Sequence, residues 1–179
     1  MQPIVAQLGP LSAVRWFAWN MRRYERTLRT HGAVRTHLLC LAISVINGCE
    51  YCTSSYAYAL ELAYLHEHGR LFPLDEHAID TLRGQPPATI RHSLTVAAQD
   101  AGLRTDVRWL DRAITLTLIH DQRATDPDDM RIAHLVRMFS RLNSIADASG
   151  IEPDEAPTPL NKNKALKLRY AALRINGST

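Results

Sequence analysis

The sequence comprises 179 residues, of which 46% are hydrophobic and 22% are charged. This composition is usual for a folded globular protein and excludes a wholly disordered chain, and the length favours a single domain. The longest apolar run, residues 38–46, is about half as long as a membrane-spanning helix needs to be. No basic region precedes an apolar stretch at the N-terminus, as a secretory signal requires. We therefore expect a soluble cytoplasmic protein with no membrane partner.

Positive charge gathers at the two ends of the chain, although the formal net charge is only +3. Residues 1–36 contain six arginines and one acidic residue, Glu25, and residues 156–179 contain five basic residues and no acidic one. The arginines recur at helical spacing among apolar residues, which is typical of solvated helix faces. The small net charge and this spacing together argue against a nucleic-acid partner.

Apolar residues recur at helical spacing along almost the whole chain, and no segment alternates as a strand does, so the sequence predicts an all-α protein. Proline and glycine residues mark most helix ends. The expected helices cover residues 11–29, 33–47, 49–68, 73–84, 87–100, 105–119, 126–148 and 161–175. Residues 151–160 contain three prolines and three acidic residues and are predicted to be a linker. We therefore expect a helical domain over residues 1–150, followed by a linker and a basic C-terminal helix in residues 151–179.

Cys49 and Cys52 form a C-x-x-C sequence on the first turn of the helix expected over residues 49–68. A separation of three residues places both sulfurs on one face of a helix, within reach of each other. The unpaired amides and the positive dipole end of a helix N-terminus stabilise a thiolate and lower its pKa. One sulfur can then act as the nucleophile while the other resolves the sulfenate or mixed disulfide. This pattern predicts a dithiol that cycles through a disulfide.

Two other interpretations of the cysteine pair stay open. A structural zinc site usually needs four ligands, but no second C-x-x-C or paired histidine follows at the usual spacing. Cys40 lies within an apolar run and is expected in the core rather than on a metal. The second alternative is a pair of inert buried thiols. We expect no metal and no bound cofactor.

Residues 39–52, with the sequence LCLAISVINGCEYC, resemble the core of the AhpD-like alkylhydroperoxidases of the carboxymuconolactone decarboxylase superfamily. The apolar helix, the Asn-Gly-Cys-x-x-Cys junction and the following alanine-rich helix carry the resemblance, together with a helix opened at residues 74–76. The match covers residues 33–84. It implies an AhpD-like helical bundle, with the C-x-x-C at the N-terminus of a central helix, in subunits that assemble as trimers or hexamers.

The resemblance also implies an activity, the thiol-dependent reduction of an alkyl hydroperoxide. Cys52 would attack the peroxide and Cys49 would close the disulfide. An external thiol or a lipoyl-bearing protein would then reduce this disulfide. The partners implied are therefore a hydroperoxide, a dithiol reductant and further copies of the chain.

Two positions depart from the family pattern. A histidine four residues after the second cysteine is replaced by Tyr56, and a glutamate twelve residues before the first is replaced by His37. In the family these groups relay a proton from the attacking thiol. His37 and Tyr56 are expected to face each other across antiparallel helices, which leads to the hypothesis that His37 serves as the base and Tyr56 links it to Cys52.

Two further functions remain open from the sequence. One is a cofactor-free decarboxylase of the kind found elsewhere in the superfamily, which does not depend on a C-x-x-C. The other is a non-catalytic helical protein that binds nucleic acid or another protein through its basic ends. A disulfide oxidoreductase that uses the same cysteine pair would share the chemistry of the peroxidase.

Overall fold

The computed structural model describes residue 5, residues 8–119, residue 124, residues 126–149 and residues 158–177. Within these residues the chain forms helices and turns and no strand, which confirms the all-α class. The predicted linker lies mostly outside the described residues. The helices, in chain order, are α2 (Pro10–His31), α3 (Ala33–Ile46), α4 (Glu50–His68), α5 (Glu76–Asp80), α6 (Pro87–Asp100), α7 (Val107–Leu118), α8 (Pro127–Ser149), the short 3-10 helix η1 (Pro159–Lys162) and α9 (Lys164–Gly177).

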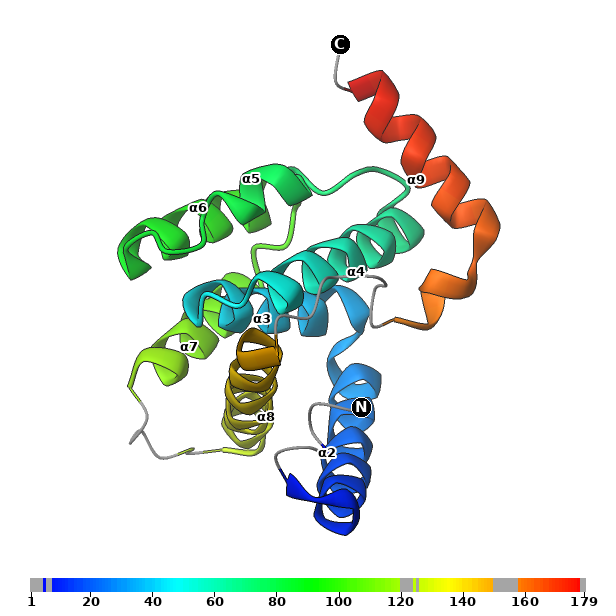
Figure 1. Ribbon diagram of the computed structural model, residues 1–179. Helices are drawn as coiled ribbons and strands as arrows, with labels where there is room; N and C mark the ends of the chain where they lie inside the picture. The colour runs from blue at the N-terminus through cyan, green and yellow to red at the C-terminus, as the bar shows by residue number, and fades with distance from the viewer. Residues whose placement is uncertain (1–4, 6–7, 120–123, 125, 150–157, 178–179) are drawn as a thin grey trace.

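Helices α3 and α4 form the centre of the bundle, and the other helices pack around them (Figure 1). Helix α3 carries apolar residues on all sides, the pattern expected of a helix surrounded by protein. Eleven of its residues are buried, from Val34 to Val45. Burial of each large apolar side chain stabilises the fold by about 1.5–3 kcal/mol. This buried pair of helices is the framework on which the cysteines lie.

The ends of the helices follow local chemistry that the sequence displays. Asp75 caps α5 by accepting a hydrogen bond from the Ala78 amide at 2.7 Å. Prolines open α2, α6 and α8, where the missing amide hydrogen costs no hydrogen bond. Helix α5 ends at Asp80 rather than at residue 84, because the chain turns there through several short-range backbone hydrogen bonds.

The basic C-terminal helix α9 packs against α4 and is part of the same helical body (Figure 1). It begins at Lys164 rather than at residue 161, since the Asn163 side chain accepts a hydrogen bond from the Leu166 amide at 3.1 Å. Arg169 donates to the carbonyl of Gly69 at the end of α4, at 2.8 Å. The positive charge of this helix therefore stabilises the negative end of α4.

Glu61 of α4 is fully buried, although a charged side chain is seldom fully buried unless it is paired. Its side chain forms an ion pair with Arg174 of α9 and accepts a hydrogen bond from the Phe72 amide at 3.3 Å. A buried carboxylate requires such partners to offset its lost hydration. The ion pair joins the C-terminal helix to the core.

None of the helices in the described part of the chain is both long and apolar enough to span a membrane.

Candidate functional site

The turn between α3 and α4 places the C-x-x-C at the start of α4. Gly48 has a φ of 74°, a left-handed conformation that favours glycine, and its amide bonds the carbonyl of Val45 at 3.1 Å. The Cys49 amide then bonds the carbonyl of Ser44 at 3.2 Å. These bonds close the end of α3 and turn the chain within two residues, so α4 packs back against α3 as the short junction predicts.

Cys49 is the N-cap residue of α4, and its sulfur caps the helix. The backbone of Cys49 is extended, with φ −74° and ψ 110°, and its Sγ accepts a hydrogen bond from the Cys52 amide at 3.3 Å. A thiolate gains more from this bond than a thiol does, because it carries the charge that the helix N-terminus favours. Both cysteines are reduced, and they occupy the same turn.

The pKa values of the two thiols are shifted in opposite directions. Hydrogen bonding from the Cys52 side chain lowers the pKa of Cys49, while burial opposes this effect. The same hydrogen bond raises the pKa of Cys52, and burial raises it further. In the reduced pair, Cys49 is therefore the sulfur that ionises first, and Cys52 retains its proton.

Charged side chains near Cys49 influence its pKa. Arg83 lies 3.6 Å from the Glu50 carboxylate and 2.6 Å from that of Asp80, and its charge also lowers the pKa of Cys49. Asp147 of α8 acts in the opposite direction. Sequence reasoning did not find Arg83 or Asp147, because both are distant in the sequence and belong to no motif around the cysteines.

Both sulfurs are covered, although the proposed chemistry needs an oxidant to reach them. Cys49 is 1% exposed and Cys52 is 4% exposed. Ala146 of α8 packs over the pair, and Tyr51 lies against it. This cover comes from α8, far along the chain, so the C-x-x-C sequence alone did not predict it. Neither sulfur is therefore openly exposed to solvent in this structure.

The third cysteine has the structural position expected from the sequence. Cys40 is fully buried in α3, and burial raises its pKa well above the ordinary thiol value. It lies in the main apolar core with Tyr24, Tyr56 and Phe139. No group of three or more metal-ligating side chains occurs among the described residues.

His37 and Tyr56 lie next to each other, as the alignment of the two helices predicts. Their ring centroids are 6.0 Å apart. His37 is 1% exposed, and burial lowers its pKa to about 4. Tyr56 packs edge-on against Phe139 at 4.8 Å. Burial raises the pKa of Tyr56, and Tyr24, Cys40 and, least of all, Cys52 raise it further. The structure therefore brings His37 to Tyr56 and Tyr56 to the vicinity of Cys52.

Comparison with known proteins finds no matching family model, no similar curated protein and no similar solved structure.

The chemical interpretation of this site therefore depends on its geometry. Two sulfurs share the first turn of a helix, and one of them has a lowered pKa. A buried tyrosine and a buried histidine lie behind them. This arrangement can exchange electrons between a dithiol and a disulfide, and it can move a proton between the two sulfurs.

Proposed function

We propose that this protein is a thiol-dependent oxidoreductase that reduces a hydroperoxide, or exchanges disulfides, through Cys49 and Cys52. The observation that carries the proposal is the position of Cys49 as the cap of α4, with its Sγ bonded to the Cys52 amide. This capping lowers the energy of the Cys49 thiolate, which is the reactive form of cysteine. The resemblance of residues 39–52 to the AhpD-like alkylhydroperoxidases supports a hydroperoxide as the oxidant.

The proposed reaction converts the dithiol to the disulfide in two steps, of which only the first consumes the peroxide. A thiolate attacks the peroxide, an S–O bond forms, the O–O bond breaks, and the alkoxide leaves as an alcohol after taking one proton. The second sulfur then attacks the sulfenic sulfur, which forms the Cys49–Cys52 disulfide and releases water. An external dithiol, such as a dihydrolipoyl group, restores both thiols and is itself oxidised to a disulfide.

The pKa values of the two thiols determine which sulfur is ionised and can attack the peroxide. The resemblance assigns the attack to Cys52, but Cys49 is the sulfur with the lowered pKa. Attack by Cys52 therefore requires its proton to pass first to Cys49, along the hydrogen bond between them. The proposal includes His37 and Tyr56 as a second route for this proton, in place of the family's glutamate and histidine.

Turnover with cumene hydroperoxide and a dihydrolipoyl peptide tests the proposal. The wild-type protein should oxidise the peptide in proportion to the peroxide consumed. Cys49→Ser and Cys52→Ser should each lower this rate at least about a hundredfold, because each removes one member of the disulfide. Cys40→Ala should retain the rate, since Cys40 is fully buried in the core. Turnover that survives in both serine variants would contradict the proposal.

A further inference from the structure

The groove between α2 and α8 gathers positive charge away from the cysteine pair. It has a volume of about 180 Å³ and is lined by Arg23, Arg26, Thr27, Pro127, Met130, Arg131 and His134. Drug-sized ligands occupy pockets of about 300–1,000 Å³, so this groove fits a smaller group. The thiol chemistry proposed above uses none of these residues.

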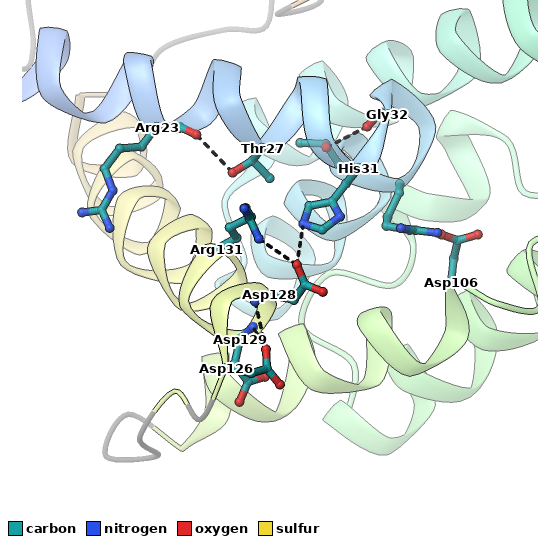
Figure 2. Close-up of polar contacts among 11 residues, drawn as sticks. Arg23, Thr27, His31, Gly32, Asp106, Asp126, Asp128, Asp129 and Arg131 are labelled. Atoms are coloured by element: carbon teal, nitrogen blue, oxygen red, sulfur yellow. Dashed lines mark hydrogen bonds and ion pairs between the residues drawn. The ribbon is translucent and has the colours of Figure 1, made fainter.

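The Asp128 carboxylate beside the groove already forms an ion pair. Asp128 lies 2.8 Å from Arg131 and 3.6 Å from His31. Figure 2 shows these two contacts, with the Arg23 side chain extending away from Asp128. Asp128 therefore offsets the charge of Arg131 and leaves that of Arg23 and Arg26 in excess.

Arg23 and Arg26 form no ion pair with a carboxylate in the part of the chain that the structure describes. The Arg23 guanidinium lies 5.8 Å from the centre of the Trp19 ring, a stacking contact that leaves its N–H groups able to bind an anion. Both arginines come from one turn of α2, three residues apart, so they lie on the same face of the helix.

His134 forms the buried wall of the groove and has one unpartnered nitrogen. The residue is 5% exposed, and its Nε2 lies 3.0 Å from Oδ1 of Asn20. Because this oxygen only accepts hydrogen bonds, Nε2 is the donor and Nδ1 carries the lone pair. Nδ1 has no hydrogen-bond partner in the described part of the chain. A buried polar atom left without a partner is costly. Because Nδ1 is a lone-pair acceptor, only a ligand group that donates a hydrogen bond, such as the P–OH of a monoprotonated phosphate, can satisfy it.

The charges around His134 favour an anion at this position. Burial and, to a smaller extent, the positive charges of Arg23 and Arg137 together lower the pKa of His134 to about 4. An anion held between these cations would reduce the repulsion between their positive charges. Arginine recognises phosphate oxygens through paired N–H donors, which suits a tetrahedral oxyanion.

We propose that this groove binds the phosphoryl group of a small ligand, held by Arg23 and Arg26 against His134. A single phosphoryl group fits both the volume and the two excess charges. An extended polyanion such as DNA would need a broader set of cations than the groove supplies.

Calorimetric titration of the full chain with inorganic phosphate at low salt tests this site. One saturable binding event per chain is expected for the wild-type protein. Arg26→Ala should weaken phosphate binding about tenfold or more, because it removes charge-assisted hydrogen bonds. The matched control is Arg22→Ala, an exposed arginine of the same helix that lies outside the groove and changes the net charge equally. This control should bind phosphate as the wild type does.

Two further results decide the proposal. Proton NMR titration should show the pKa of His134 rising by about one unit when phosphate saturates the wild type, but not in Arg26→Ala. Absence of saturable phosphate binding, or equal losses in Arg22→Ala and Arg26→Ala, would overturn the proposal. Tighter binding of a DNA duplex, weakened equally by both variants, would overturn it in favour of a polyanion surface. None of these outcomes depends on the cysteine chemistry.

Discussion

At the scale of single residues, the chemistry of the site depends on where one proton lies. The first turn of α4 stabilises negative charge on Cys49, through the Cys52 amide and the Cys52 thiol. Each contact is weak by itself, but a shift of one pKa unit corresponds to about 1.4 kcal/mol between the two protonation states. The hydrogen bond from Cys52 therefore controls the reactivity of Cys49.

The Cys52 thiol should be replaceable by another donor but not by a methyl group. Cys52→Ser keeps an O–H group that can donate to Cys49, so the pKa of Cys49 should stay below the ordinary thiol value. Cys52→Ala removes the donor, so the pKa of Cys49 should rise. The pH dependence of iodoacetamide alkylation at Cys49 measures both values. Equal midpoints for the two variants would show that the side chain of residue 52 does not set the pKa of Cys49.

His37→Ala should slow the reaction of Cys52 with a hydroperoxide, because it removes the last group of the proposed proton route. His37 accepts a proton only weakly, since burial lowers its pKa to about 4. We therefore expect a reduction of about threefold to tenfold and a changed pH profile of the rate. Stopped-flow kinetics on the Cys49→Ser background measure this step, and the exposed His66→Ala provides the control. A rate and pH profile equal to those of His66→Ala would remove His37 from the mechanism.

At the scale of helices, the C-terminal helix α9 is bound to α4 through a buried charge. Glu61 is fully buried, while the Arg174 side chain is 27% exposed. Removing one partner of such a pair leaves an uncompensated charge in the interior, which costs more than the intact pair contributes. Tyr170 of α9 also contacts α5, because its hydroxyl donates to the Glu76 carboxylate at 2.6 Å.

Arg174→Ala should lower the free energy of unfolding by about 1–3 kcal/mol, a value below that of a fully buried pair because Arg174 is partly exposed. The double variant Glu61→Gln with Arg174→Ala should recover part of this loss, because the buried charge is then absent. Urea unfolding followed by circular dichroism gives both values. A double variant that is less stable than Arg174→Ala alone would contradict this account of α9.

The helices themselves were largely predictable, and their packing was not. Proline and glycine residues mark the helix ends in the sequence, so most bounds agree within a few residues with those of the structure. The burial of Glu61 could not be predicted, because its partner Arg174 lies on the last helix. The cover over Cys49 depends on Ala146 of α8 in the same way. The local sequence predicts where a helix begins and ends, but contacts between helices distant in the sequence determine which side chains are buried.

At the scale of the whole molecule, buried histidines couple the fold to pH. His37 has a pKa of about 4 in the folded protein, below the ordinary value of 6.5. The unfolded chain therefore binds a proton that the folded chain does not bind between these two values. Stability from this source is complete above about pH 6.5 and is lost progressively as the pH falls towards 4.

The free energy of unfolding should fall by up to about 3 kcal/mol between pH 6.5 and pH 4 because of His37. His37→Gln should reduce this slope, since glutamine does not titrate. Urea unfolding across this pH range, in wild type and variant, measures the difference. The account of His37 as a buried neutral residue would be wrong if the two proteins lost stability in parallel.

The cysteine pair was predictable from its spacing alone, because two cysteines three residues apart at a helix start lie on one face of the helix. The central claim is that this pair exchanges electrons with a hydroperoxide. Treatment of the reduced protein with one equivalent of cumene hydroperoxide, followed by peptide mass mapping, tests the claim most directly. The account predicts the loss of two thiols per chain and a peptide that contains a Cys49–Cys52 bridge, with Cys40 still reduced. Recovery of Cys49 and Cys52 as intact thiols would contradict it.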